Sequence, residues 1–395
     1  MAEWIECKIS DIGTVIGGAT PSTKKPENYE NGTISWITPK DLSTFTRRYI
    51  QRGERNITEI GLKSCSTQLL PKHTVLFSSR APIGYVAIAA NEVCTNQGFK
   101  SVVPNENIDP LFLYYLLKYN KDKIEGMGSG TTFKEVSGNT MKNIVVSVPI
   151  DKKVQERISS ILGSIDDKIE VNESINNNLL EQALILYATR FSSLDKNSCI
   201  GNYCAVKSGF AFKSSWWTNS GVKVIKIGSI NQDNLNLLEC SYINEDKADK
   251  AKDFVAKAGD LLIAMTGATI GKFAMVPYSS EVLLVNQRVG KFFLGNNPVE
   301  KLPFIYCTLK QPEVYSEVVN RGQGSAQPNI SASDIMNIPC AIPSQEAINI
   351  FNNTARPLFD LIISNQRENQ QLSELRDTLL PKLMSGELGV SDIDL

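Results

Sequence analysis

Apolar residues recur in steps of three and four along residues 154–190, the spacing typical of one face of a coiled-coil helix. The seam runs through Ile158, Leu162, Ile165, Ile169, Asn172, Asn176, Leu179, Ala183 and Leu186. A second seam begins 193 residues later (351 minus 158) and runs through Phe351, Ala355, Leu358, Ile362, Asn365, Asn369, Leu372, Arg376 and Leu379. Because even the two Asn return in place, the pattern predicts two copies of one unit.

The segments before each seam have shorter periods and many Gly-containing turns, which indicates mixed α/β globules. In the first copy the pattern predicts a short strand near residues 9–15, a hairpin built from residues 74–77 and 85–88, and an apolar helix over 111–119. The second copy repeats these features at offsets between 187 and 194. The predicted domains are 1–150, 193–343, the long helices 151–192 and 344–386, and an acidic tail over 387–395.

Each seam needs a partner, and the two seams have equal length, so we expect the helices to pair with each other. Antiparallel pairing places Asn172 and Asn176 opposite Asn365 and Asn369, where side-chain hydrogen bonds would fix the register. The alternative for these Asn is a solvated face in mid-helix. About 37 helical residues span roughly 55 Å. Antiparallel pairing would hold the two globules at opposite ends, over successive turns of duplex DNA about 34–36 Å apart.

The charge distribution changes this picture only slightly. The whole chain has a net charge of −1, which argues against a simple basic nucleic-acid binder. Lys and Arg minus Asp and Glu gives +3 for 1–150 (17 minus 14) and +2 for 193–343 (15 minus 13). The same count gives −2 for 151–192 (5 minus 7) and −4 for 344–395 (4 minus 8). With no apolar run near the roughly 20 residues of a membrane span, we expect a soluble cytoplasmic protein.

No motif makes a positive case for catalysis, a metal or a bound cofactor in this chain. The eight Cys include no C-x-x-C pair, and His73 is the sole His, so zinc and disulfide frameworks are not indicated. The segment 266–272 resembles part of a P-loop, but it is one residue short and Phe273 replaces the magnesium-binding Ser or Thr.

The loops of both globules carry side chains that suit contacts to DNA. Arg, Asn and Gln make bidentate contacts with base edges, whereas Lys and Ser mostly hold phosphates. The candidates in the first copy are Lys40, Arg47, Arg48, Ser79 and Arg80. The candidates in the second copy are Lys213, Thr266, Arg288, Arg321, Gln323, Gln327 and Asn329. For each of these residues alone, an ordinary surface position is the simpler interpretation.

Short sequence motifs along the chain, taken in order, resemble those of the specificity (S) subunit of type I restriction-modification systems. In the first half they include Gly17-Gly18-x-x-Pro21-Ser22, Arg80-Ala81-Pro82-Ile83-Gly84, Thr95-Asn96-Gln97-Gly98 and Ile165-Asp166-x-Lys168-Ile169. In the second half they include Gly259-Asp260-Leu261-Leu262, Gly267-x-x-Ile270-Gly271, Asn286-Gln287 and Leu379-Leu380-Pro381-Lys382-Leu383. No single phrase decides the resemblance, but together they cover almost the whole chain.

The resemblance implies an α/β protein with two similar target-recognition domains, separated by an antiparallel coiled-coil pair of long helices with a pseudo-two-fold repeat. It implies a non-catalytic subunit that reads a bipartite, asymmetric sequence in double-stranded DNA and docks two methyltransferase (M) subunits. S-adenosylmethionine and ATP would then be bound by partner subunits, and restriction (R) subunits would be further partners. Apolar residues beside the seam, namely Ile175, Leu180 and Leu375, fit a helix flank that partners cover.

Two other classes of function stay open at this point. One is a coiled-coil scaffold that recruits proteins only. The other is a single-chain DNA-modifying enzyme whose active site has no recognisable motif.

Overall fold

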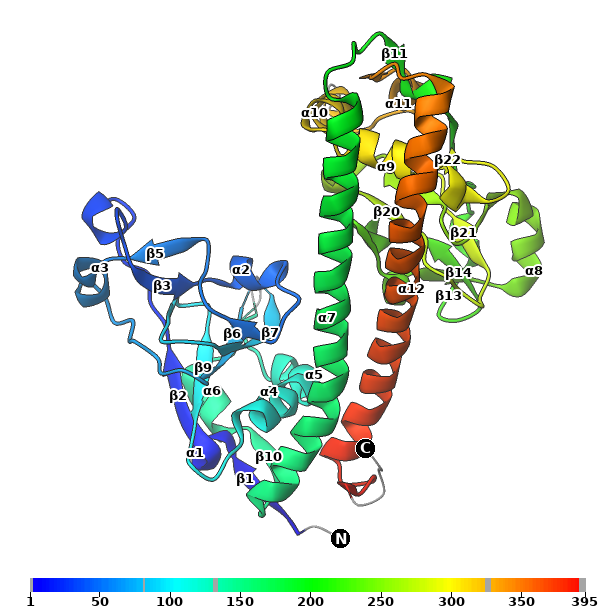
Figure 1. Ribbon diagram of the computed structural model, residues 1–395. Helices are drawn as coiled ribbons and strands as arrows, with labels where there is room; N and C mark the ends of the chain where they lie inside the picture. Colours follow the sequence, from blue (N-terminus) through cyan, green and yellow to red (C-terminus); the bar gives the residue numbers. More distant parts are fainter. Residues whose placement is uncertain (1–2, 81, 131–133, 324–327, 391–395) are drawn as a thin grey trace. The chain divides into compact units, whose positions relative to one another are not determined.

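The computed structural model describes residues 3–80, 82–130, 134–323 and 328–390 (Figure 1). The chain divides into two compact units, and each contains one globule together with parts of both long helices. Unit 1 comprises Met1–Asp167 and Ser373–Leu395, and unit 2 comprises Lys168–Leu372. The two units are therefore described separately.

Three sheets form the globule of unit 1. The five-stranded sheet has the order β2-β9-β6-β7-β4, the three-stranded sheet has the order β5-β3-β8, and β1 pairs with β10. The strands are β1 (Trp4–Lys8), β2 (Gly13–Gly17), β3 (Ile34–Ile37), β4 (Tyr49–Ile50), β5 (Arg55–Ile57), β6 (Val75–Ser79), β7 (Ile83–Ala89), β8 (Cys94–Thr95), β9 (Lys100–Pro104) and β10 (Val145–Pro149). The predicted hairpin is confirmed, since β6 and β7 pair antiparallel.

Short helices complete unit 1. They are α1 (Ile9–Ile12), α2 (Pro39–Ser43), α3 (Glu59–Lys63), α4 (Pro110–Tyr119), α5 (Lys121–Gly126), α6 (Gly138–Asn143) and the 3-10 turn η1 (Pro26–Asn28). The prediction of a strand over residues 9–15 is wrong in its first half: Asp11 accepts the backbone N–H of Lys8, which closes a helical turn before β2 begins. The apolar helix is confirmed as α4, because Asp109 caps Phe112 N and Pro110 occupies the first turn.

Unit 2 has two larger sheets, with the orders β12-β22-β19-β20 and β13-β17-β14-β21-β18, and two strand pairs, β11-β23 and β15-β16. Its strands are β11 (Ser198–Cys199), β12 (Ala205–Ser208), β13 (Trp217–Thr218), β14 (Val222–Ile225), β15 (Ile230–Asn231), β16 (Asn234–Leu235), β17 (Ser241–Ile243), β18 (Val255–Ala256), β19 (Leu261–Ala264), β20 (Phe273–Met275), β21 (Leu283–Val285), β22 (Val289–Phe293) and β23 (Pro339–Cys340).

The α-helices of the second globule are α8 (Glu245–Ala248), α9 (Leu302–Leu309), α10 (Pro312–Gly322) and α11 (Ala332–Met336). Its 3-10 turns are η2 (Ile200–Asn202), η3 (Ser214–Trp216), η4 (Ile227–Ser229), η5 (Leu237–Glu239), η6 (Asp249–Phe254), η7 (Gly267–Thr269) and η8 (Pro298–Glu300). Every residue of α9 is buried, so this helix lies between the sheet and the long helices of its unit (Figure 1).

Both long helices form as the seams predict. They are α7 (Lys152–Phe191) and α12 (Gln345–Met384). Pro381 does not end α12 early, and Gly386 follows it with a φ of +74° that favours glycine. Among the described residues, no helix is both long and apolar enough to span a membrane.

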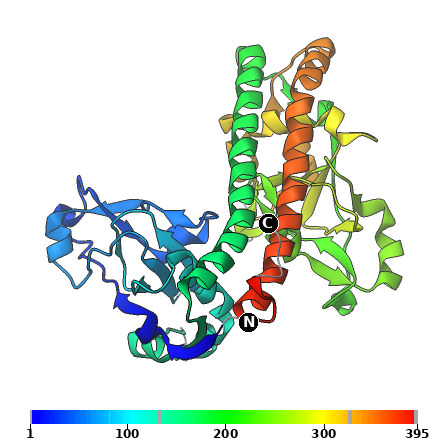
Figure 2. The ribbon, with the colours of Figure 1, turned by 60° about the horizontal axis from the view of Figure 1, so that its bottom comes forward.

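The two helices run antiparallel, and in unit 2 both views show them side by side (Figures 1 and 2). The side-chain amide of Asn172 donates to Asn369 Oδ1 at 2.8 Å, and that of Asn365 donates to Asn176 Oδ1 at 2.8 Å. These are the contacts that antiparallel pairing requires. Glu368 accepts a second bond from Asn172 at 2.7 Å, and this bond, with Lys168 nearby, lowers the pKa of Glu368.

Each globule packs on its own portion of the helix pair. In unit 1 the core joins α4 to Ile158, Ile161 and Leu162 of α7 and to Leu383 of α12. In unit 2 the core joins α9 to the C-terminal part of α7 and to the first half of α12. The seam residues therefore serve two purposes, because they pair the helices and anchor a globule.

Candidate nucleic-acid interface

In unit 1 the end of strand β6 holds two loops together through backbone hydrogen bonds. Ser79 N donates to Gly98 O at 2.7 Å, and Val136 N donates to Ser79 O at 3.0 Å. The strand end, the turn over 95–98 and the loop before Val136 therefore converge at one edge of the sheet. We call this convergence the loop junction.

Unit 2 repeats the loop junction with other residues. Met265 takes the place of Ser79: its N–H donates to Arg288 O at 3.0 Å, and its carbonyl accepts from Ile330 N at 2.9 Å. Isolated bridges match as well, since Arg80 pairs with Glu135 in unit 1 and Thr266 pairs with Asn329 in unit 2. The backbone of the junction is thus duplicated, while its side chains differ.

The repeated Asn-Gln phrase builds the turn in both junctions. Asn96 Oδ1 accepts from Gly98 N at 2.9 Å, and Asn286 Oδ1 accepts from Arg288 N at 3.2 Å. Such a local side-chain bond is the usual way in which Asn fixes a turn. It leaves the following residue, Gln97 or Gln287, exposed on the turn.

At the junction of unit 1, one carboxylate faces two cations. Glu135 lies 3.4 Å from the guanidinium of Arg80 and 3.3 Å from the ammonium of Lys100, and all three are partly buried. Two cations against one anion leave an excess positive charge, which suits a phosphate or an acceptor edge of a base. Ser79 is fully buried and its hydroxyl donates to Gly98 O, so its side chain shapes the junction from inside.

At the junction of unit 2, the sequence candidates Thr266, Arg288 and Asn329 come together. Arg288 and Asn329 are exposed. Thr266 Oγ1 is buried and, among the described residues, has no hydrogen-bond partner. The side chains of Arg288 and Asn329 are therefore the ones that this junction offers at the surface.

Two further candidates of unit 2 lie at the end of α10, before the segment that contains Asn329. Gln323 is exposed directly after α10. Arg321 is less available for contacts to DNA, because it pairs with Glu317 at 2.8 Å and donates to Asp334 O at 3.0 Å. Gln327 lies outside the described residues.

The backbone bonds that define the loop junctions do not include the remaining candidates. Lys40 is exposed and pairs with Glu54 at 2.8 Å. Arg47 is exposed and lines a pocket described below. Arg48 is buried, donates to Gly163 O at 3.2 Å and pairs with Asp167, so it ties the globule to α7. Lys213 is exposed just before η3, beside the buried Phe212 and Trp216.

Sequence reasoning overlooked three side chains that the junctions bring forward, namely Lys100, Gln97 and Gln287. The duplicated Asn-Gln phrase was a usable signal, because a repeated turn exposes the same position in both copies. Lys100 had no such signal: it joins the junction only because β9 passes next to β6.

Among the described residues we looked for two features of catalytic sites, a metal-binding group and a reactive thiol. These residues contain no group of three His, Cys, Asp or Glu that could hold a metal ion. Burial raises the pKa of several thiols, to about 11 for Cys94 and about 12 for Cys204. Protonated, buried thiols are poor nucleophiles. These cysteines therefore act as small apolar core residues.

A sequence profile described as the type I restriction modification DNA specificity domain matches residues 1–181 and again residues 195–375. The chain belongs to this family, and it contains the family's domain twice. The duplication inferred from the two seams is therefore confirmed, as is the resemblance to specificity subunits.

Similar proteins carry names of the same kind. The type I restriction enzyme MjaIX specificity subunit of Methanocaldococcus jannaschii is 34% identical, over 99% of this chain and 95% of its own length. The HindI specificity subunit of Haemophilus influenzae is 22% identical, over 98% of this chain and all of its own length (100%). The crystal structure of an S subunit from M. genitalium has the same fold, with a TM-score of 0.55 at 18% identity over 97% of this chain and 96% of that one.

Proposed function

We propose that this chain reads a bipartite, asymmetric sequence in double-stranded DNA, with one half-site for each unit. The observation that carries the proposal is the duplicated loop junction with unlike side chains. Similar backbones present Arg80 and Lys100 in unit 1, but Arg288 and Asn329 in unit 2. Similar scaffolds with different donors and acceptors suit two different base sequences.

The proposed roles follow from side-chain chemistry. Arg288, Arg80 and Asn329 are the candidates for bidentate contacts to base edges, and Lys100, Lys40 and Lys213 for phosphate contacts. Arg48 is better suited to holding unit 1 together, because it is buried and bonded to α7. The modest charge of each globule agrees with weak binding by the chain alone, since phosphate contacts supply most of the salt-dependent affinity.

We further propose that the helix pair docks two methyltransferase subunits, which would bring S-adenosylmethionine, and that ATP-dependent restriction subunits would join such a complex in the cytoplasm. Large apolar side chains support a docking surface on the helices. Within unit 2 the exposed ones are Val171, Ile175, Ile185, Ile350 and Leu361. Leu375 in unit 1 is also exposed, whereas Leu180, which the sequence placed on this flank, is buried in the core of unit 2. Helix faces this apolar are typical of surfaces that a partner covers.

Methylome sequencing of the host with and without this gene tests the proposal directly. Loss of adenine methylation at one split motif is the expected result, and an unchanged methylome would contradict it. The same comparison excludes a coiled-coil scaffold, because a scaffold that recruits only proteins would not alter methylation at a defined sequence.

An exchange of residues 1–150 for the matching segment of another specificity subunit tests modular reading. Only one half of the methylated motif should change. An Arg288→Ala variant should relax one base position in the other half, at a cost of about 1–3 kcal/mol in discrimination. A matched control is Arg321→Ala, because that side chain is bonded within unit 2. Relaxation in both halves by one variant would contradict the assignment of one half-site to each unit.

Equilibrium binding of S-adenosylmethionine to the purified chain separates the proposal from a single-chain modifying enzyme. The proposed subunit should bind none without its partners. Binding by the isolated chain would favour the enzyme.

A further inference from the structure

Both copies place a Lys beside a Tyr one helical turn earlier. Lys118 in unit 1 follows Tyr114 on α4, and Lys310 in unit 2 follows Tyr306 at the end of α9. Each pair lies 192 residues from the other (306 minus 114, 310 minus 118). Each ammonium lies over the ring of its Tyr, at 5.2 Å and 5.9 Å from the ring centre. The two pairs are therefore structural counterparts.

In unit 2 a carboxylate of the chain itself completes the pair. Asp233 stands in the turn between β15 and β16 with a φ of +66°. Its carboxylate accepts from the Lys310 ammonium at 2.5 Å and from the Tyr306 hydroxyl. Gln366 of α12 donates to the carbonyl of Asp233 at 3.1 Å and so fixes the turn. The ring of Phe273 covers the ammonium from the side, at 5.6 Å.

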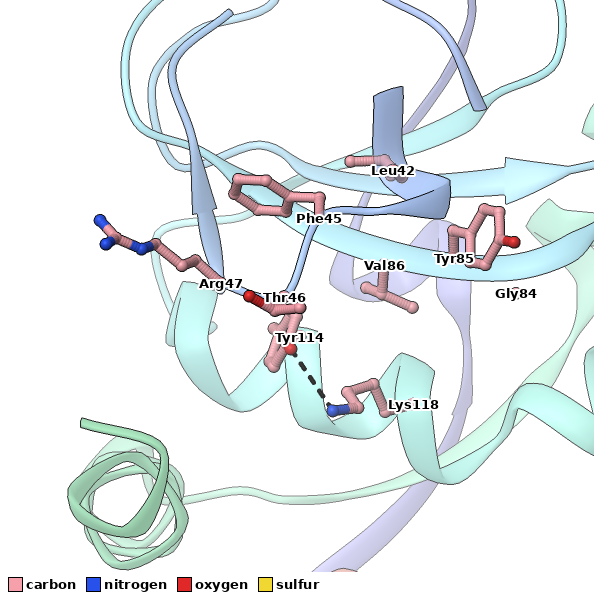
Figure 3. Close-up of a pocket in the computed structure, with 9 residues that line it drawn as sticks. All are labelled: Leu42, Phe45, Thr46, Arg47, Gly84, Tyr85, Val86, Tyr114 and Lys118. Carbon is pink, nitrogen blue, oxygen red and sulfur yellow. Dashed lines mark hydrogen bonds between the residues drawn. The ribbon is translucent and has the colours of Figure 1, made fainter. Parts of the chain in front are cut away.

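In unit 1 the corresponding place is an open pocket of about 210 Å³ (Figure 3). Ile83-Gly84 matches Ile270-Gly271, and both glycines have positive φ, +98° and +83°. This match puts Val86 where unit 2 has Phe273, so the wall is smaller. The loop over 45–47 follows β3 as the Asp233 turn follows β14, but it contains no acidic residue.

Lys118 is the cation at the base of this pocket. It donates to the hydroxyl of Tyr114 at 3.4 Å (Figure 3), and among the described residues no carboxylate forms an ion pair with it. Burial, and next the charge of Arg376, lower its pKa, while Asp166 and Asp377 act against this shift. Arg47 lines the pocket, but its guanidinium points away from Lys118 in Figure 3. An anion that entered would therefore meet the Lys118 ammonium.

We infer that the Lys118 pocket binds a carboxylate, and that an acidic side chain of a partner protein supplies it. The inference rests on the proposed function, because the partner expected there is a methyltransferase subunit. In unit 2 the same Lys and Tyr hold Asp233, so this arrangement of donors is known to accept a carboxylate. The volume suits one side chain. A DNA phosphate is the competing occupant. In unit 2, however, Lys310 and Tyr306 already bond to Asp233, so the same position in that unit is not available to a phosphate.

Zero-length carbodiimide cross-linking of the complex with methyltransferase subunits tests this inference. The reagent joins an amine to a carboxylate in contact, with loss of water, and mass spectrometry identifies the linked peptides. The expected product joins Lys118 to an Asp or Glu of the partner. The Lys310–Asp233 link within the chain is an internal positive control. A Lys118→Arg variant keeps the charge and should lose the cross-link while the complex persists.

Two further variants probe the pocket without relying on the reagent. Lys118→Met should weaken binding of the methyltransferase subunit by about tenfold or more, as expected when one member of a desolvated charge pair is lost. Val86→Phe imitates unit 2, fills the pocket and should weaken binding similarly. In the free chain Lys118→Met should leave the Tm unchanged, whereas Lys310→Met should lower it by about 2–4 °C.

The outcomes separate the two proposals. If the wild-type chain binds no methyltransferase subunit, the proposed function fails. If the complex forms and the control link appears without a link from Lys118 to the partner, the pocket inference is overturned and the proposed function stands. If Lys118→Met lowers affinity for DNA and leaves partner binding unchanged, a phosphate is the ligand and the carboxylate assignment is wrong.

Discussion

The two units attach their globules to the long helices in different ways. In unit 1 the carboxylate of Asp166 on α7 is buried against Arg376 of α12 at 2.8 Å and accepts from the Tyr115 hydroxyl at 2.6 Å. In unit 2 the positions 193 residues away are Phe359 and Ala183, which are fully buried and apolar. In the same core Tyr187, Phe191, Phe304 and Phe351 pack ring against ring, with centroids 5.0–5.9 Å apart.

This difference shows that one backbone plan tolerates two kinds of contact between a globule and the long helices. We call the ring contacts of unit 2 the aromatic junction and the buried ion pair of unit 1 the polar junction. The aromatic junction is stabilised by apolar burial and ring contacts. The polar junction depends on complete pairing, because each buried charge loses its hydration, and only its partners can offset that free-energy cost. Burial and the charge of Asp166 raise the pKa of Tyr115 well above its ordinary range, so this phenol stays a hydrogen-bond donor. Unit 1 should therefore be sensitive to loss of one partner, and unit 2 to loss of volume.

Removing volume from the aromatic junction should have the largest effect. Phe359 is fully buried and its ring lies 5.3 Å from that of Tyr306. Phe359→Ala should lower the free energy of unfolding of unit 2 by about 3–5 kcal/mol, through lost burial and a cavity. Chemical denaturation followed by a probe in unit 2 measures the loss. Phe359→Leu, which keeps most of the volume, should cost clearly less, and equal losses would contradict a packing role.

Breaking the polar junction from one side should come next. Asp166→Asn keeps the shape but removes the buried countercharge of Arg376, which then pairs only with the half-exposed Asp377 at 2.8 Å, and we expect a loss of up to about 3 kcal/mol. Replacing both partners by apolar residues, as in Asp166→Leu with Arg376→Met, should recover most of it. A double-mutant cycle on the free energy of unfolding measures the coupling. Additive losses would show that the two charges do not stabilise each other.

The four Asn of the seam should oppose stability while fixing register. Asn172, Asn176 and Asn365 are buried, and Leu at such positions packs better. Replacing all four, Asn369 included, with Leu should raise the free energy of unfolding by about 1–3 kcal/mol and loosen the helix register. Calorimetry gives the first quantity, and cross-linking of Cys pairs placed in alternative registers gives the second. A clear loss of stability would count against their proposed role.

The smallest expected effect is a pH dependence of stability that comes from one surface ion pair of unit 2. Lys196 lies 2.5 Å from Glu313, and its hydrogen bond, with a backbone contribution, lowers the pKa of Glu313. A lowered carboxyl pKa adds stability above the unfolded value near pH 4.3, which is lost as pH falls through the folded pKa. Because both groups are about half exposed, the effect should be only a few tenths of a kcal/mol. Glu313→Gln should reduce the loss of stability between about pH 5 and pH 3, and an unchanged pH profile would exclude this contribution. Lys121 occupies the corresponding position in unit 1, so that unit should lack the effect.

Much of the fold was accessible from the sequence because its signals are local. Repeated apolar spacing determined both long helices, and the offset of 193 residues revealed the duplication and suggested which Asn would face each other. The apolar run after Asp109 and Pro110 was enough to predict α4. Helical periodicity and capping depend on neighbours within a few residues, so a single chain displays them openly.

The tertiary structure alone decided which loop residues meet. Arg48 and Arg80 look alike in the sequence, yet one is buried against α7 and the other lies at the loop junction. Likewise, nothing near Lys118 and Lys310 reveals that one lines a pocket while the other meets Asp233, 77 residues away. Such contacts join segments far apart in the chain, and their cost and gain arise only when the globule closes around them.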